Sequence, residues 1–321
     1  MQKTTLKKEN NTIEDLHDKI LFNKIKLQCL LKDKNNKKIL DNWLKTELAY
    51  TSNGIEGNTL TRKETELVIS EKITTGAKPI NDYIEAVNHA RAFDFICQAA
   101  QQFEVINEDF ILKIHKIILG GIDDANAGFY RSVRVRISGS ETILPNPLKV
   151  PDLMADFGKW LEKSELDTDF IIKAIEAHYR LVSIHPFVDG NGRTARLLMN
   201  AMLLKYEIGA LIIRKIDRKR YLSSLETYQT TGNSEPYYKF MLSALNKSLK
   251  MMIDMLDTSK PETTQDLLTI AKFAKLADLP VSTVRYYMKE GKIRPIAYSS
   301  SGYALFDKKQ VADIKAVMNK K

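Results

Sequence analysis

Along most of the chain, apolar residues recur three and four positions apart, the spacing of a helix that buries one face. This pattern predicts helices over residues 13–31, 39–55, 61–75, 79–102, 108–119, 152–163, 169–184, 192–206 and 217–256. Boundary residues agree with it. Thr61 and Glu64 have the spacing of a capping box, and Asn107 is a favourable N-cap. We therefore expect a mainly α fold.

One stretch departs from the helical period. Between Val133 and Leu144 apolar and polar residues first alternate, and Ser138, Gly139 and Ser140 then supply turn chemistry. The pattern predicts a short β-hairpin in an otherwise helical protein. A purely structural hairpin and a hairpin that binds a partner are both compatible with it.

A polar, proline-containing stretch divides the chain near its C-terminal end. Residues 257–266 contain hardly any apolar side chain, so they are predicted to be a linker. We expect an N-terminal helical region at 1–106, a core at 107–256 and a separate module at 267–321.

Charge and cysteine content narrow the function classes only a little. The 321 residues carry a formal charge of +9 with a pI near 9.2, which favours an anionic partner such as ATP or nucleic acid over a neutral one. A lysine-rich solvated surface is the plain alternative. Cys29 and Cys97 are the only cysteines, and no apolar run approaches the roughly 18 residues of a spanning helix. We expect a cytoplasmic protein without a membrane segment.

The most informative stretch runs from His185 to Arg196. Gly190, Asn191 and Gly192 readily adopt positive φ, and successive N–H groups in that conformation form an anion-binding nest. The nest leads directly into a helix, whose N-terminal N–H groups also favour phosphate. The sequence therefore predicts a phosphate site at this turn.

Charged residues of the same stretch fit such a site. Arg193 and Arg196 are three apart and project from one helix face, where two cations are costly unless an anion lies between them. Asp189 is a hard oxygen ligand suited to Mg²⁺ on phosphates, and His185 titrates near neutral pH. Taken singly, a histidine before proline or a Gly-Asn-Gly turn is more often structural.

The stretch resembles the signature of the Fic family, H-P-F-x-[DE]-G-N-G-R-x-x-R, at every position. The resemblance implies a helical catalytic core that moves AMP from ATP to a protein Ser, Thr or Tyr hydroxyl. His185 would be the general base, Asp189 would hold Mg²⁺ (or Mn²⁺), and Arg196 would clamp the γ-phosphate. The remaining phosphate contacts would come from Gly190, Asn191, Gly192, Arg193, Thr194 and Ala195.

The predicted hairpin and its flank resemble the flap of that family, beginning at Gly128-Phe129-Tyr130-Arg131. In the family the flap covers the nucleotide and pairs with the target protein as an added strand. The resemblance places Ser138, Gly139, Ser140 and Glu141 against the nucleotide. It also places Tyr221 and Gln229 at the adenine or ribose, although ordinary helix packing explains these two almost as well.

The end of the second predicted helix carries Ser52, Glu56 and Gly57. A carboxylate at a helix C-terminus is unfavourable by itself, so a positive group should offset it. The three residues fit the inhibitory motif S/T-x-x-x-E-G/N of the Fic family, on a helix expected at about 39–57. The resemblance pairs Glu56 with Arg196, and a pair worth roughly 2–3 kcal/mol would lower activity about 30- to 150-fold. In some family members the same glutamate supports removal of AMP.

The C-terminal module reads as two short helices separated by a turn at 278–280, followed by a turn and strand at 301–306. This helix-turn-helix with a wing resembles MerR-type DNA-binding domains, mainly in Val284-Arg285-Tyr286-Tyr287 and Gly302-Tyr303. The resemblance implies DNA contact through residues 267–321. A protein-docking or dimerising module remains the alternative.

Three functions follow from these residues. The first is a protein adenylyltransferase restrained by Glu56, which family resemblance also makes a candidate homodimer. The second is a DNA-binding transcriptional regulator whose core senses ATP. The third, the toxin half of a toxin–antitoxin pair, fits less well because the inhibitory motif is already on this chain.

Overall fold

In the computed structural model of the chain, residues 12–137, 139–163, 169–257, 267–290, 292–293, 295, 297–298, 304–307, 310–311 and 314 are described. The chain divides into two compact units, residues 1–256 and residues 257–321. The predicted linker lies almost wholly outside the described residues, and Ser138 lies outside them too.

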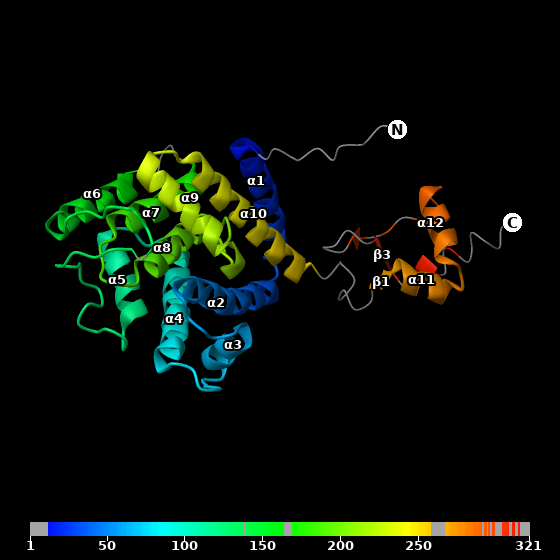
Figure 1. Cartoon of the computed structure of the whole chain (residues 1–321), viewed down its shortest axis with the longest axis horizontal. Coiled ribbons are helices and arrows are strands. Elements are labelled where there is room, and N and C mark those ends of the chain that lie inside the picture. Colours follow the sequence, from blue (N-terminus) through cyan, green and yellow to red (C-terminus); the bar gives the residue numbers. More distant parts are fainter. Residues whose placement is uncertain are drawn as a thin grey trace. The chain divides into compact units, whose positions relative to one another are not determined.

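The first unit is helical (Figure 1). Its helices are α1 (Ile13–Leu30), α2 (Lys34–Glu56), α3 (Arg62–Ser70), α4 (Ile80–Gln101), α5 (Glu108–Leu119), α6 (Val150–Lys163), α7 (Phe170–Ile184), α8 (Asn191–Lys205), α9 (Arg218–Thr231) and α10 (Glu235–Leu256). Two 3₁₀ turns, η1 (Pro147–Lys149) and η2 (Lys215–Asp217), precede α6 and α9. The mainly α fold class is confirmed.

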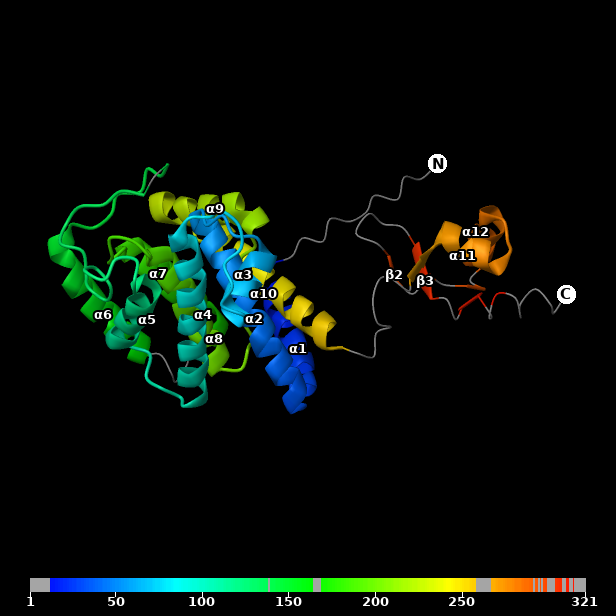
Figure 2. The same ribbon diagram turned by 90° about the horizontal axis from the view of Figure 1, so that it is seen from below.

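Helix α8 lies at the centre of this unit. It packs against α7, α4, α5 and α2, and its side chains from Thr194 to Leu203 are all buried. Helix α1 runs beside α10 at one side of the unit, as Figures 1 and 2 both show. The consequence for function is that the start of α8 is fixed by four neighbouring helices.

Local capping chemistry sets several helix starts. Thr12 with Asp15 and Thr61 with Glu64 form reciprocal capping boxes, and Asn107 accepts a hydrogen bond from Phe110 N. The predicted helix over 217–256 is two helices, α9 and α10. Gly232 ends the first with a φ of 75°, and Pro236 stands in the first turn of the second.

The predicted β-hairpin is not formed in the described residues between 131 and 146, because no strand is assigned there. Gly139 has a φ of 75° and Ser140 N donates to Ile137 O at 3.2 Å, so the predicted turn is present without the ladder. Side-chain hydrogen bonds hold this segment in place of a ladder: its tip bonds α9, and its base bonds the turn after α7. We keep the name flap for residues 128–146.

The described residues of the second unit include a small sheet and two helices. Strands β1 (Leu267–Thr269), β2 (Ala297–Tyr298) and β3 (Ala304–Asp307) pair antiparallel in the order β1-β3-β2. Helices α11 (Ile270–Ala277) and α12 (Val281–Lys289) share with this sheet a core that includes Phe273, Val284 and Phe306. The helix-turn-helix and the wing strand of the sequence-based prediction are therefore present.

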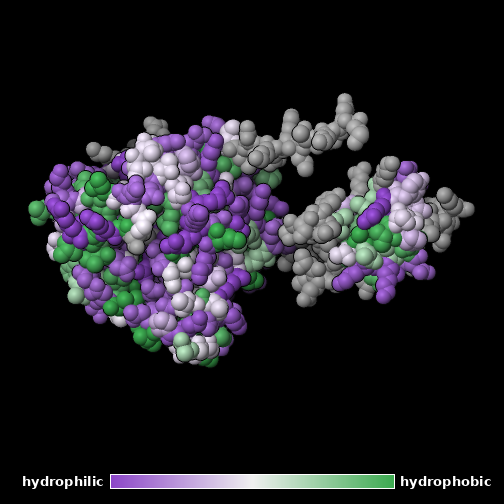
Figure 3. All heavy atoms as spheres, viewed as in Figure 1, coloured by the Kyte–Doolittle hydropathy of each residue, from purple (hydrophilic) through white to green (hydrophobic). Residues whose placement is uncertain are grey.

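The visible surface of the first unit is mostly hydrophilic, with hydrophobic side chains in separated patches (Figure 3). Among its exposed apolar residues are Phe22 and Ile25 on α1, and Phe129 and Ile143 on the flap. Within the part of the chain that is described, no helix combines the length and apolarity that crossing a membrane requires.

Candidate functional site

A sharp turn between α7 and α8 builds the candidate site. His185 ends α7 with a φ of 51°, and Gly190 begins α8 with a φ of 76°. The turn is closed by Asn191, whose side chain accepts from Phe187 N and donates to Phe187 O, both at 2.9 Å. These reciprocal bonds fix the backbone before any ligand arrives.

Beneath the turn lies His115 of α5. Its ring stacks on Phe187 with centroids 3.6 Å apart, and Nε2 donates to Asp189 O at 3.0 Å. Because Gly128 N donates to Nδ1 at 2.9 Å, the proton sits on Nε2 and the ring is neutral. Burial lowers the pKa of His115 to about 4, which stabilises this arrangement. One side chain thus joins the turn to the base of the flap.

The N-terminus of α8 presents backbone N–H groups rather than polar side chains. Asn191, Thr194 and Ala195 are all buried. Thr194 N donates to Gly190 O at 2.9 Å, so the backbone N–H groups that remain for a ligand are those of Asn191, Gly192 and Arg193. At Gly192 a Cβ atom would overlap the Glu56 carboxylate and lie 3.0 Å from the Arg196 guanidinium. A glycine is therefore required here for close approach.

Arg193 is held by two carboxylates. Its guanidinium bonds Glu85 Oε1 at 2.6 Å and Asp189 Oδ2 at 2.9 Å. Arg193 is 3% exposed and Asp189 is 67% exposed, measured on the side chains. The predicted metal ligand therefore lies at the surface of the site, beside the N-terminus of α8.

Arg196 is bound by the end of α2. It donates through Nε to Ser52 Oγ at 2.9 Å, and through its terminal nitrogen to Ser52 O at 3.0 Å and Glu56 Oε1 at 2.6 Å. Burial alone lowers the pKa of Arg196, but the Glu56 carboxylate and Tyr221 outweigh it and hold that pKa above its ordinary value. The structure thus brings together Ser52, Glu56 and Arg196, as the sequence predicts.

His185 is oriented by its own helix. Nδ1 lies 3.3 Å from Val182 O, and since a carbonyl oxygen only accepts, Nδ1 carries the proton. Nε2 then keeps the lone pair that a general base needs. Burial lowers the pKa of His185, and the nearby Arg131 adds to the lowering. The ring is therefore neutral at neutral pH.

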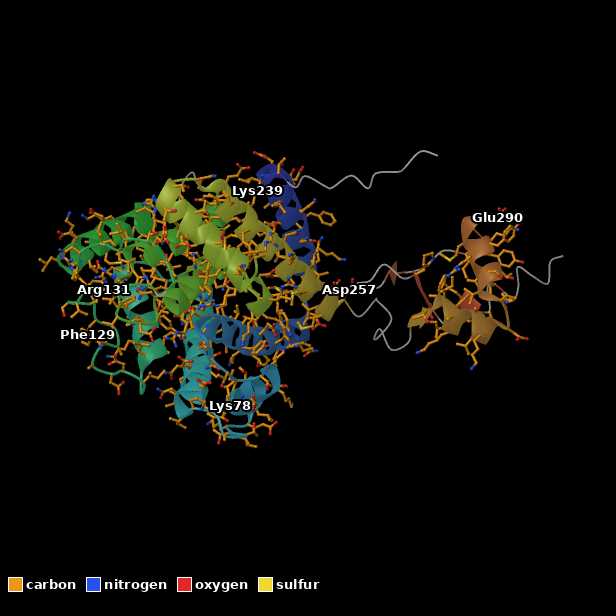
Figure 4. All side chains as sticks on the ribbon, viewed as in Figure 1. Lys78, Phe129, Arg131, Lys239, Asp257 and Glu290 are labelled. Carbon is orange, nitrogen blue, oxygen red and sulfur yellow. The ribbon has the colours of Figure 1, made fainter. Side chains whose placement is uncertain are left out.

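The base of the flap is anchored by Arg131, which Figure 4 labels beside Phe129. The Arg131 guanidinium donates to His185 O at 2.8 Å, Val133 O at 3.1 Å and Pro145 O at 2.7 Å. Arg131 N also donates to Pro186 O at 2.9 Å. Both ends of the flap are therefore tied to the turn that carries His185.

The tip of the flap is bound to α9. Glu226 Oε1 accepts from Ser140 Oγ at 2.6 Å and from Glu141 N at 2.9 Å. Gln229 Oε1 accepts from Thr142 Oγ1 at 3.1 Å, and its amide nitrogen donates to Ser183 Oγ at 3.2 Å. The predicted residues Ser140, Glu141 and Gln229 are thus brought together, while Ser138 lies outside the described residues.

Tyr221, which the resemblance places at the adenine or ribose, lies in the core. Its side chain is 1% exposed, and its hydroxyl donates to His178 Nε2 at 2.9 Å. His178 Nδ1 in turn donates to the Tyr237 hydroxyl at 2.7 Å, and burial lowers the pKa of His178 to about 3. Tyr221 belongs to a buried chain of hydrogen bonds beneath Arg196, because α9 turns that face toward the core.

Sequence reasoning missed four side chains that shape the site: Glu85, His115, Glu226 and Arg131 as an anchor. His115 stands on the buried face of α5 between Ile111 and Ile118, and a histidine on an apolar helix face was a detectable signal. Glu85 lies near Asp82 on α4, and Glu226 lies among hydroxyl and amide side chains of α9. Nothing in the local pattern separated them from ordinary surface acids.

Two family models match the chain. Residues 105–203 match the Fic/DOC family, and residues 268–319 match the MerR HTH family regulatory proteins. The first match contains the whole turn from His185 to Arg196, and the second contains α11 and α12.

Relatives and solved structures agree with the first match. The chain is 34% identical over 206 residues to the protein adenylyltransferase Fic of Drosophila erecta, which is 64% of this chain and 41% of the relative. It therefore spans about two fifths of the length of the curated relatives it matches. A Fic domain containing signaling protein from Bacteroides thetaiotaomicron aligns with a TM-score of 0.66 and 29% identity, over 74% of this chain and 97% of that one. Residues 134–508 of Fic-1 from C. elegans align with a TM-score of 0.65 and 27% identity, over 78% and 73%.

Proposed function

We propose that this chain transfers AMP from ATP to a Ser, Thr or Tyr hydroxyl of a protein, because residues 105–203 match the Fic/DOC family. The observation that carries the proposal is the geometry of one turn. It sets a neutral His185, a positive-φ glycine and two buried arginines around the N-terminus of α8. The 34% identity to proteins named as protein adenylyltransferases supports the same activity.

His185 Nε2 takes the proton of the target hydroxyl, whose oxygen attacks the α-phosphorus. The bond from the α-phosphorus to the bridging oxygen breaks, and pyrophosphate leaves. The N–H groups of the first turn of α8 and the side chains of Arg193 and Arg196 face the negative charge of the phosphates. Holding ATP in line with the hydroxyl contributes the rest of the rate.

Asp189 would hold a Mg²⁺ ion, with Mn²⁺ as a substitute. Mg²⁺ is usually bound by one or two carboxylates together with phosphate oxygens and waters. An accessible carboxylate beside a phosphate-binding turn meets that requirement, although Asp189 must first loosen its bond to Arg193. When bound, the ion neutralises phosphate charge. The residues of this chain orient the nucleotide and move the proton.

We also propose that Glu56 restrains the enzyme. Arg196 is engaged by both Ser52 and Glu56, so a γ-phosphate that needs this guanidinium must displace the carboxylate. ATP that binds without displacing Glu56 would hold its α-phosphorus out of line. The same carboxylate beside the site could orient a water that hydrolyses the bond between AMP and the modified protein, which releases AMP.

The test of both proposals is self-modification measured by intact mass. The protein is incubated with Mg²⁺ and ATP, and the AMP adduct is quantified for the wild type, Glu56→Gly and His185→Ala. We expect more adduct for Glu56→Gly, because Arg196 is released, and none for His185→Ala. Glu235→Ala is the matched control, because Glu235 is an exposed acid on α10 that pairs with Lys239. This variant should form as much adduct as the wild type. Adduct on His185→Ala would overturn the assigned base.

The proposal also includes two protein partners, a target protein and a second copy of this chain. A target protein would dock on the flap, where Phe129 and Ile143 are 65% and 95% exposed. A homodimer would use the exposed apolar face of α1, which carries Phe22 and Ile25. Sedimentation of the wild type and of Phe22→Asp tests the dimer.

Two free cysteines, Cys29 and Cys97, fit a reducing compartment such as the cytoplasm.

The second candidate function is DNA binding by the second unit. Helix α12 exposes Arg285 and Tyr286, the latter at 53%, and the unit matches a family of MerR HTH regulatory proteins. In helix-turn-helix proteins the second helix enters the major groove. On this hypothesis, the protein is a transcriptional regulator that senses ATP through the first unit.

A further inference from the structure

A side chain from α9 closes the end of the helix that carries Glu56. Arg218 Nε donates to Ile55 O at 2.6 Å, across 163 residues of sequence. The last four carbonyl groups of a helix lack partners within it, and they form the negative end of its dipole. A guanidinium at this point satisfies one carbonyl and opposes the dipole at the same time.

Helix α2 has no cation of its own for this purpose. Its last turn contains no basic residue and ends on the acidic Glu56. Two positive groups compensate for that, both supplied by other helices: Arg196 on the carboxylate side chain and Arg218 on the backbone of the preceding residue. Without such groups, the end of α2 would tend to fray.

The surroundings of Ile55 show that this contact fixes a position. Ile55 is 2% exposed and packs in the main core, while the Lys215 side chain of η2 lies against Gly54, 3.3 Å from where a Cβ would stand. Glu56 itself is 37% exposed at its side chain. The last turn of α2 is thus held by contacts with η2 and the start of α9. The Glu56 carboxylate extends from this turn to Arg196.

We infer that Arg218 is a positioning residue for Glu56: it holds the last turn of α2 so that the carboxylate reaches Arg196. The inference rests on the proposed restraint by Glu56 and names a residue that maintains it. Arg218 is exposed and bonds α2, whereas Arg196 is buried at the predicted phosphate site. Removal of the Arg218 side chain should therefore weaken the restraint and leave the residues of the predicted phosphate site in place.

Arg218→Ala should raise the initial rate of AMP adduct formation about 3- to 10-fold. This is the size expected for loss of one charge-assisted hydrogen bond at an exposed position. The rise should disappear in a Glu56→Gly background, because there is then no carboxylate to position. Lys219→Ala, which removes the neighbouring exposed cation of α9, is the matched control and should leave the rate unchanged.

The measurement is a double-mutant cycle on the full chain: wild type, Arg218→Ala, Glu56→Gly and both together, assayed by intact mass and checked for folding by thermal unfolding. A rise that vanishes in the Glu56→Gly background supports the inference. If Glu56→Gly raises the rate and Arg218→Ala does not, the inference fails and the restraint stands. If Arg218→Ala alters the rate equally in both backgrounds, or lowers it in both, Arg218 acts on the core and the inference also fails. If Glu56→Gly has no effect, the proposed restraint itself is wrong.

Discussion

The side chains of the candidate site are oriented by their hydrogen-bond partners. His185 has a free Nε2 because its own helix carbonyl, Val182 O, accepts the proton of Nδ1. Arg196 is directed by Ser52 and Glu56, and Arg193 by Glu85 and Asp189. Each of the two arginines is therefore neutralised by at least one carboxylate.

The proposed restraint by Glu56 should be limited by the exposure of the Glu56 side chain. A buried charge-assisted pair would be worth roughly 2–3 kcal/mol, but the Glu56 side chain is 37% exposed, and water screens it. We expect Glu56→Gly to raise the rate of self-modification about 10- to 30-fold, with the rate taken from intact mass at early times. An increase below about twofold would show that Arg196 is not the limiting contact.

The lowered pKa of His185 makes a prediction about pH. A general base acts when it is neutral, so activity should persist as the pH falls below 6.5 and decline only through the lowered pKa. The initial rate of the Glu56→Gly variant at saturating ATP, measured from pH 5 to 8 at constant ionic strength, gives the profile. A midpoint above 6.5 would show that His185 is not desolvated in the working enzyme.

Tyr221 makes a prediction about stability. Tyr221→Phe would leave the buried Nε2 of His178 without its donor, which costs about 1–3 kcal/mol. For a unit of this size, Tm should fall by about 2–4 °C per kcal/mol, as followed by circular dichroism. Tyr286→Phe removes an exposed hydroxyl on α12 and should leave Tm unchanged. Equal Tm values for the two variants would exclude the proposed hydrogen-bond chain.

At the scale of elements, the flap is held by side chains at its base and its tip, with no described strand ladder between them. Helix α9 contacts two elements beside the site, since Arg218 bonds the end of α2 and Glu226 bonds the flap. Its buried face, at Tyr221, meets the network beneath Arg196. The order of the flap should therefore depend on α9.

Removing the tip contact should expose the flap to proteases. Glu226→Ala loses the acceptor of Ser140 Oγ and Glu141 N, so limited trypsin digestion should cut after Arg134 or Arg136 about 3- to 10-fold faster. The fragments are identified by mass. Thr227→Ala, on the adjacent exposed position of the same helix, serves as the control. Unchanged cleavage in Glu226→Ala would mean that the base contacts alone order the flap.

At the scale of the whole molecule, the two units make separable predictions. A chain truncated after about residue 265 keeps the whole of the first unit, so it should still form the AMP adduct in the Glu56→Gly background. If the second unit binds DNA, the full chain should be retained on duplex DNA, and its affinity should fall steeply between about 50 and 200 mM salt. Retention of the truncated chain, or retention that salt does not change, would count against DNA binding by residues 267–321.

The sequence by itself determined the parts of this protein that depend on local chemistry. Helical periodicity, the capping boxes and the turn residues identified nearly every helix, because each of these signals acts within a few positions. The stretch from His185 to Arg196 predicted a phosphate site for the same reason: nest, helix start and arginines are neighbours along the chain.

Tertiary structure decided which distant residues meet. The side chains of Glu85 and His115 reach the site from other helices, and Arg218 and Glu226 reach α2 and the flap. No local pattern encodes the rotation that brings them there. The burial of Tyr221 and the missing ladder in the flap are likewise consequences of what packs beside each segment. Local sequence determines where helices and turns form. The packing of the whole core determines which side of each helix faces its neighbours.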